Sequence, residues 1–232
     1  MRIENPILPH TPRPTAGASA HAAGGVHLRS GIARPPAHPT GHSLVSFTGH
    51  LRCRHTDAAI HQFGPESFDL CFTRFGVMFF ADPVAAFRNI RRGMKSNGRL
   101  LLAVFRSASE NPWATACVVA IRHLVPPPPT LGPGDPGQFS WSDPARVRRI
   151  LDGAGFANVV MTPLDLSFSL GANAVEAAHF TTFIGQGARL LYGQPDGTRE
   201  AARVALEGFF KEYEGQGGVS LPGALWFVSA RA

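Results

Sequence analysis

The sequence predicts an α/β fold with a parallel sheet for most of its 232 residues. Two short, mainly apolar runs, 67–75 and 99–105, fit strands that are buried on both faces. A segment with helical spacing lies between them. Strand, helix and strand within 67–105 are typical of a βαβ unit, whose two strands run parallel.

The connecting helix is expected to begin at Asp82-Pro83, because aspartate is a favoured N-cap and proline is favoured at the first helical position. Its apolar residues then recur at helical spacing: Val84, Phe87, Ile90 and Met94. Basic residues on the other face gather toward the C-terminal end, where the helix dipole favours them. The Asn97-Gly98 pair predicts a turn before the second strand.

The rest of the chain predicts further helices and a final strand pair. Residues 126–137 are rich in proline and glycine, which indicates a surface loop within an insert. Hydrophobic and polar residues alternate over 164–170, as in a strand with one covered face. The remaining expected elements are a helix from Ser142-Asp143-Pro144 to Gly155, a helix from Asn173 toward Tyr192, a helix from Thr198, and a strand over 224–229.

The first 56 residues differ in composition from the remainder. They contain six of the 22 basic residues, a single acid, and seven of the ten histidines, so most of the net charge of +6 belongs to them. Prolines and small residues interrupt every hydrophobic run there, and we expect an irregular, disordered segment over 1–56. Residues 57–232 form the expected globular domain, with a net charge of only +1.

Composition excludes several classes of protein. Three cysteines cannot form a disulfide scaffold, and no apolar run approaches the length of a membrane span. No secretory apolar core is present, so we expect a cytoplasmic protein. Six scattered arginines without a platform of aromatic residues give little support to nucleic-acid binding, and we expect no nucleic-acid partner. The histidines lack ligand spacing, so no metal site is expected.

Candidate chemistry is expected where the two parallel strands end. Ligands of open α/β sheets bind at the carboxyl ends of the strands. Arg74 and Arg106 lie at these ends, and each is either a functional side chain or a solvated strand end. His61, Glu110 and His123 are possible proton acceptors, but the sequence pairs none of them, and no nucleophile motif appears, so catalytic residues are not identified.

The block from Ser67 to Pro83 resembles class I S-adenosylmethionine-dependent methyltransferases, particularly the small bacterial ubiquinone/menaquinone-biosynthesis branch. The similarity continues through Asn97-Gly98-Arg99-Leu100, Ser142-Asp143-Pro144 and Ala154-Gly155-Phe156 to the last strand, and covers about 57–232. The resemblance implies a Rossmann-like sheet with helices on both faces and a C-terminal antiparallel strand pair. It also implies S-adenosylmethionine as the cofactor and a small-molecule methyl acceptor.

The resemblance assigns the cofactor-binding positions by strand order. Asp57 and Ala58 would follow the family's third strand, near the adenine. Thr73, Arg74 and Phe75 would follow the fourth strand, close to cofactor and substrate. Residues 107–145 and 171–220 would cover the acceptor pocket. Their aromatic residues favour a hydrophobic acceptor, although ordinary core packing explains them equally well.

The chain departs from the family upstream of Asp57. The glycine-rich loop after the first strand and the acidic residue ending the second should lie there, and residues 1–56 show neither. The sheet is therefore expected to be incomplete in its N-terminal half. Two functions follow: a methyltransferase, or a non-catalytic remnant whose N-terminal part was replaced by a frameshift or an altered start.

Overall fold

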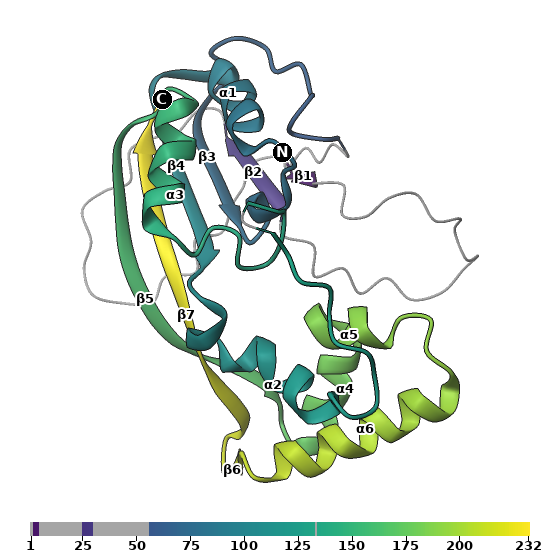
Figure 1. The fold of residues 1–232 in the computed structure, drawn as a ribbon. Helices are drawn as coiled ribbons and strands as arrows, with labels where there is room; N and C mark the ends of the chain where they lie inside the picture. Colours follow the sequence, from purple (N-terminus) through teal and green to yellow (C-terminus); the bar gives the residue numbers. More distant parts are fainter. Residues whose placement is uncertain (1, 5–24, 30–55, 133) are drawn as a thin grey trace. The chain divides into compact units, whose positions relative to one another are not determined.

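The computed structural model describes residues 2–4, 25–29, 56–132 and 134–232. The described chain divides into two compact units. The first unit comprises Met1–Ala103, Ala145–Met161 and Val228–Ala232. The second comprises Val104–Pro144 and Thr162–Phe227. Helices and strands occur in both units, and the predicted α/β fold class is confirmed (Figure 1).

The strands form one sheet of mixed direction. Its order is β1 (Arg2–Glu4), β2 (Gly25–Arg29), β3 (Phe68–Arg74), β4 (Met94–Phe105), β7 (Gly218–Arg231) and β5 (Ala157–Gly171). A two-residue strand, β6 (Glu214–Gly215), pairs with β7. Neighbours β5 and β7 run in opposite directions (Figure 1). They correspond to the final antiparallel pair that the sequence predicts.

The predicted βαβ unit is present as β3, α1 (Pro83–Gly93) and β4. Strands β3 and β4 pair in parallel, with Cys71 opposite Leu100 in the register. The Asp82 carboxylate accepts a hydrogen bond of 2.9 Å from the Ala85 amide, which confirms the predicted N-cap. Phe87, from the apolar stripe of the helix, is fully buried in the core.

A bulge replaces the predicted turn at Asn97-Gly98. Strand β4 already begins at Met94, and Asn97 lies inside it with φ at +60°. The register of β3 with β4 passes from Phe68 opposite Met94 to Leu70 opposite Arg99. The extra residues of β4 therefore face the single residue Asp69. Asparagine tolerates the left-handed region better than most residues, which explains why the strand accommodates it.

Two short strands occur within the first 56 residues, where the sequence predicts no regular structure. Strand β2 pairs with β1 and with β3, both times in antiparallel fashion. The side of β3 away from β4 is therefore paired along Val26 to Arg29. The predicted disorder of the other residues up to 55 lies outside the described residues, and the division of the chain at residue 56 stays a prediction.

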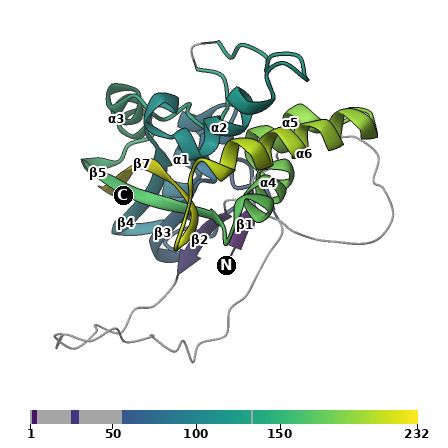
Figure 2. The ribbon, with the colours of Figure 1, turned by 90° about the horizontal axis from the view of Figure 1, so that it is seen from below.

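Helices α1 and α3 (Pro144–Gly153) cover one face of the strands of the first unit (Figures 1 and 2). The Arg88 side chain donates a hydrogen bond of 2.9 Å to the Gly153 carbonyl at the end of α3. Phe87 and Phe156 meet edge to face with ring centroids 6.1 Å apart. Gly155 lies just past the end of α3, as predicted, and its φ of +89° is the left-handed conformation that glycine adopts readily.

The second unit includes a small helical cluster besides its strand segments. It contains α2 (Pro112–Ile121), α4 (Ala174–Phe183), α5 (Gly185–Leu191) and α6 (Asp196–Lys211), with the short η2 (Ala108–Glu110) before α2. Its buried core includes Ile121, Ala177, Leu206 and Phe210. Asn173 caps α4 as predicted, with its side chain 2.9 Å from the Glu176 amide. Helix α6 begins two residues before the predicted start at Thr198.

The helix predicted from Asn173 toward Tyr192 is divided into two. Ile184 has extended backbone angles, and Gly185 follows with φ at +71°. A helix cannot continue through such a pair, so α5 starts as a separate element. Gly187 then approaches α4 closely, where a Cβ atom would overlap the Thr181 carbonyl.

Candidate functional site

The carboxyl end of β3 carries three of the five residues that the sequence assigns to the cofactor. The Thr73 side chain is 3% exposed, and its Oγ1 atom has no hydrogen-bond partner among the described residues. Arg74 is exposed, with its guanidinium carbon 5.9 Å from the centroid of the Phe75 ring. A buried hydroxyl without a protein partner is uncommon, and such a group can bind a ligand or a water molecule.

Phe75 has the backbone conformation that turns the chain away from the sheet. Its φ is +62°, which is unusual for a bulky side chain. Its amide donates a hydrogen bond of 3.0 Å to the Ala103 carbonyl on β4. Backbone strain of this kind is often found at ligand sites. The short η1 helix (Val77–Phe79) follows directly.

Asp57 and Ala58, the other two predicted residues, form a turn that is anchored on α1. The Asp57 carboxylate accepts from the Ala59 amide at 2.8 Å, and its carbonyl accepts from the His61 amide at 2.9 Å. The buried Ala58 offers its carbonyl to the Asn89 amide group at 3.0 Å. The structure thus holds this turn on α1 and holds Thr73–Phe75 on β4.

Asn89 is a residue of this site that the sequence analysis did not identify. It lies on the buried face of α1, and its Nδ2 also donates to the His61 carbonyl at 2.8 Å. The Arg92 guanidinium donates to its Oδ1 at 2.7 Å. A polar residue among the apolar positions of an amphipathic helix was the signal that could have revealed it.

Arg106, at the end of β4, lies in a charged cluster of the second unit. Its guanidinium donates to Asp165 at 2.6 Å and also to Glu110, and it lies 5.3 Å from the Trp226 ring centroid. The Ser107 hydroxyl donates to Glu110 at 2.6 Å. This hydrogen bond, together with Arg106, lowers the pKa of Glu110. Such a carboxylate is a weak proton acceptor, and the sequence did not indicate its partners Arg106 and Ser107.

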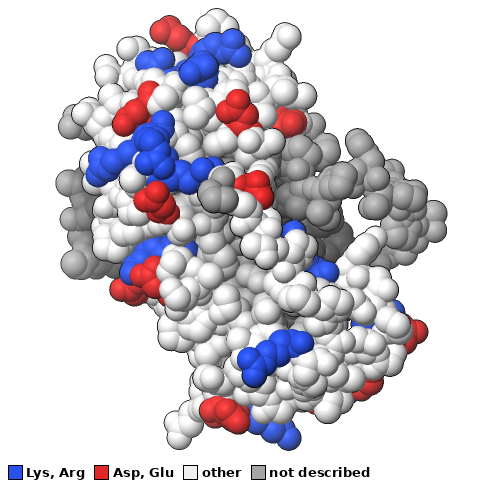
Figure 3. Space-filling view, in the orientation of Figure 1, with Lys and Arg blue, Asp and Glu red and all other residues white. Residues whose placement is uncertain are grey.

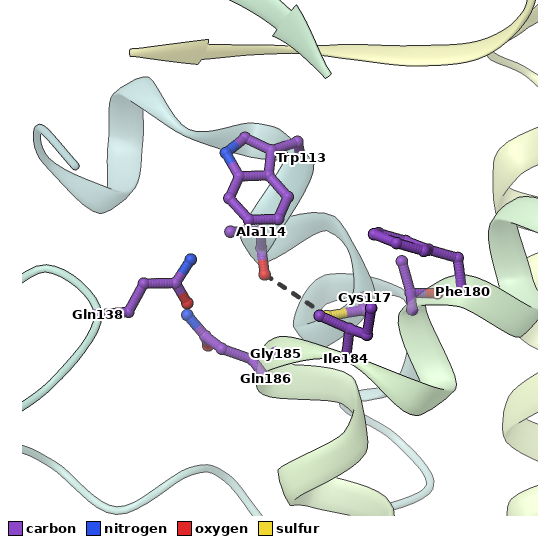
Figure 4. A pocket seen from close by; sticks show the side chains of 9 residues that line it. Trp113, Ala114, Cys117, Gln138, Phe180, Ile184, Gly185 and Gln186 are labelled. Carbon is purple, nitrogen blue, oxygen red and sulfur yellow. Dashed lines mark hydrogen bonds between the residues drawn. The ribbon is translucent and has the colours of Figure 1, made fainter. Parts of the chain in front are cut away.

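Helices α2, α4 and α5 surround a small pocket in the second unit (Figure 4). Its lining includes Trp113, Phe180 and Cys117 together with the side-chain amides of Gln138 and Gln186. The enclosed space is about 10 Å³, which is close to the minimum for one water molecule. The pocket lies in the region expected to cover an acceptor, but in this conformation it is closed to larger molecules.

The other expectations concern metals, membranes and charge. Groups of three or more metal-ligating side chains do not occur among the described residues. Within the same residues, no helix combines the length and hydrophobicity of a membrane span. On the face drawn in Figure 3, basic and acidic side chains of the described residues are interspersed.

The comparisons with known proteins give one match to a protein family. Residues 35–102 match the family model described as a methyltransferase domain. The matched segment contains the turn at Asp57, all of β3 and α1, and the first part of β4. The match also includes residues 35–56 of the basic segment, which lie upstream of the resembling block from Ser67 to Pro83. No curated protein sequence matches the chain.

Several solved structures are similar to the chain at low sequence identity. A candidate methyltransferase from Bacillus halodurans is 14% identical, with a TM-score of 0.42 and coverage of 76% of this chain and 75% of that one. The YcgJ protein from Bacillus subtilis is 16% identical, with a TM-score of 0.42 and coverage of 77% and 69%.

Phosphoethanolamine N-methyltransferase 2 from Haemonchus contortus, solved with S-adenosyl-L-methionine, is 14% identical with a TM-score of 0.38. The similarity covers 76% of this chain but only 36% of that enzyme. All three TM-scores are below 0.5, so the assignment depends on the family match alone. That match confirms the resemblance indicated by the sequence: residues 35–102 of this chain are similar to the methyltransferase-domain family.

Proposed function

We propose that the chain is an S-adenosylmethionine-dependent methyltransferase that binds its cofactor at the carboxyl end of β3. The observation that carries the proposal is the buried Thr73 hydroxyl, which has no hydrogen-bond partner among the described residues and lies within the segment that matches the family. The five predicted cofactor residues, Asp57, Ala58, Thr73, Arg74 and Phe75, all lie in this segment and in the first unit.

The available groups fit parts of this cofactor. A hydroxyl and a carboxylate accept hydrogen bonds from amino and hydroxyl groups, and the half-buried Phe75 ring offers an apolar face. When bound, S-adenosylmethionine supplies a methyl group on a positively charged sulfur, which an oxygen, nitrogen or carbon nucleophile displaces. Thr73 and Phe75 would orient the donor, since their backbones are fixed on β4. Alignment of this kind supplies much of the catalysis in such a transfer.

The acceptor is proposed to be an apolar small molecule that enters near Trp113 and Phe180. These side chains line the pocket of the second unit, and Gln138 and Gln186 add amide groups that can bind one polar substituent. Replacing Phe180 with alanine should raise the KM for phenol or aryl-amine acceptors without changing the Kd for S-adenosylmethionine. Phe183→Ala is the matched control, because that ring on the same helix is 65% exposed.

A second candidate, a remnant that does not bind the cofactor, is supported by the direction of β2. Val26, near the start of this strand, lies opposite Thr73 in the antiparallel register. The carboxyl end of β2 at Arg29 therefore lies opposite Leu70, near the start of β3 and away from Phe75. A strand whose following turn binds a cofactor has its carboxyl end beside the carboxyl ends of its parallel neighbours, and β2 does not have this direction.

Calorimetric titration with S-adenosylmethionine separates the two candidates. The enzyme should bind it saturably at roughly micromolar concentration, whereas the remnant should show no binding at about millimolar concentration. Thr73→Val should weaken binding about tenfold or more, because a hydrogen bond to the ligand is lost. Thr130→Val is the control, since Thr130 is exposed in the insert. Equal affinity in both variants would exclude Thr73 from the cofactor site.

A further inference from the structure

A second hollow lies at the other end of β3 and β4 from the proposed cofactor site. We infer that it binds a small phosphate monoester that also carries a hydroxyl group. The hollow has a volume of about 250 Å³ and is open to solvent. It is lined by Asp69, Lys95, Ser96, Asn97, Gly98, Arg99 and Arg231, and we call it the basic hollow.

The bulge of β4 shapes the basic hollow. Residues 95–98 face only Asp69 in the register with β3, so this part of β4 extends beyond a regular ladder. Asn97 has φ at +60°, and its carbonyl accepts a hydrogen bond of 3.2 Å from the Arg231 guanidinium. The Ala232 amide donates to the Gly98 carbonyl at 2.9 Å. The rim is therefore held in place before any ligand arrives, which reduces the entropy lost on binding.

Three cationic side chains and one carboxylate line the hollow, giving a net positive charge. Arg99 and Arg231 form no ion pair with any other residue that the structure describes. The Lys95 ammonium lies 4.0 Å from the Asp69 carboxylate, beyond hydrogen-bonding distance. All three cationic side chains therefore have N–H groups that can donate hydrogen bonds to an anion. Two guanidinium groups suit a phosphate, whose oxygens accept paired hydrogen bonds from each.

The Asp69 carboxylate explains why the ligand should also carry a hydroxyl. Its side chain lines the hollow and is 28% exposed, and its Oδ2 atom lies 4.0 Å from the Lys95 ammonium. A partly exposed carboxylate at this position would repel a phosphate but would accept a hydrogen bond from a hydroxyl. A hydroxylated phosphate monoester satisfies the three cations and the carboxylate together.

The basic hollow is separate from the proposed cofactor site. Asp69 lies four residues before Thr73 on the same strand, a spacing of roughly 13 Å along an extended chain. Both sites belong to the first unit, but they share no residue. Binding at the basic hollow can thus be measured without S-adenosylmethionine, and either proposal can fail alone.

Calorimetry with glycerol 3-phosphate tests the inference on the full chain at low ionic strength. We expect saturable binding of one molecule per chain, with a Kd of about 1 mM or lower. Inorganic phosphate should bind more weakly, because it has no carbon-linked hydroxyl for Asp69. Arg99→Gln and Arg231→Gln should each weaken glycerol 3-phosphate binding about tenfold. Arg122→Gln, an exposed arginine of the second unit, should leave it unchanged.

The Asp69→Asn variant provides the second comparison. It should reduce the preference for glycerol 3-phosphate over inorganic phosphate, while binding of both persists through the arginines. Circular dichroism identifies any variant that fails to fold. The inference is overturned if glycerol 3-phosphate shows no saturable binding at about 10 mM. It is equally overturned if the arginine variants bind as tightly as the unmodified chain.

Discussion

The Asn111 side chain pairs with both backbone polar groups of Ala224. Its Nδ2 donates to the Ala224 carbonyl at 3.0 Å, and its Oδ1 accepts from the Ala224 amide at 3.0 Å. Asn111 is fully buried, and the Trp113 indole also donates to its Oδ1 at 3.1 Å. The Ala224 carbonyl also accepts from the Arg106 amide at 3.0 Å, so the carboxamide is the second donor to this carbonyl and the acceptor for the Ala224 amide, and it attaches α2 to the strand.

Asn111→Ala should therefore lower the free energy of unfolding by about 1–3 kcal/mol, because the Ala224 amide loses its partner in a buried place while the Ala224 carbonyl keeps the Arg106 amide. Urea denaturation measures the change. Gln216→Ala removes an exposed amide from the β6–β7 turn and should change stability by less than about 0.5 kcal/mol. A similar small loss for Asn111→Ala would mean that water replaces the carboxamide.

Gly223 is expected to tolerate no side chain. A Cβ atom there would overlap the Phe168 ring and approach the Trp113 ring to 2.9 Å. These two rings stack with centroids 4.4 Å apart. We expect Gly223→Ala to destabilise the chain by about 1–3 kcal/mol through overpacking. Gly208→Ala on the exposed face of α6, with open space around it, should instead stabilise by up to about 1 kcal/mol. Thermal denaturation of the pair distinguishes the two effects.

We expect the Thr73 hydroxyl to lower the free energy of unfolding of the ligand-free chain while it contributes to ligand binding. Replacing it with valine removes a buried hydroxyl that lacks a partner and preserves the branched shape. The free energy of unfolding should rise by about 1 kcal/mol in the absence of ligand. Loss of stability in this variant, measured by denaturation without added cofactor, would show that the hydroxyl already has a partner in solution.

Glu110 should make stability depend on pH in the acidic range. Its pKa is lowered in the folded state by the Ser107 hydroxyl and by Arg106. The stabilisation is therefore present above the unfolded value of about 4.3 and is lost as the pH falls through the folded value. In the Glu110→Gln variant, the free energy of unfolding should fall less steeply as the pH is lowered from about 7 to 3, and denaturation at a series of pH values measures this. An unchanged curve would assign the acid sensitivity to other carboxylates.

The buried cysteines should react slowly with thiol reagents. Complete burial raises the pKa of Cys71 far above its usual value, and burial also raises the pKa of Cys117. The thiolate is the reactive form, so both residues should be labelled only at the rate of local opening. Mass spectrometry after timed labelling measures this. Rapid modification of Cys71 in the folded chain would contradict its position in β3.

Part of the fold follows from local sequence signals. The apolar run 67–75, the Asp82-Pro83 cap and the stripe led by Phe87 specify β3, α1 and β4 with little help from the rest of the chain. Helix α2 was not predicted, because its apolar residues surround the axis and leave no polar face to define a period. The break at Ile184 was also missed, since it depends on the close approach of Gly187 to α4.

The candidate site was only partly predictable for a related reason. Strand ends and family resemblance pointed to Thr73 and Phe75, but side-chain pairing depends on contacts distant in sequence. Asp165, for example, pairs with Arg106 from 59 positions away. The left-handed backbone at Phe75 had no local signal either, because bulky residues rarely adopt it.

The position of β7 has a consequence for the order in which the molecule is made. This strand comes from the last residues of the sequence, yet it lies between β4 and β5. While a ribosome is still translating the region before Gly218, β4 and β5 have no strand to join them. Each then exposes an edge that other chains can pair with. Protection of the nascent chain at this stage, by slow release or by a chaperone, would limit aggregation until β7 closes the sheet.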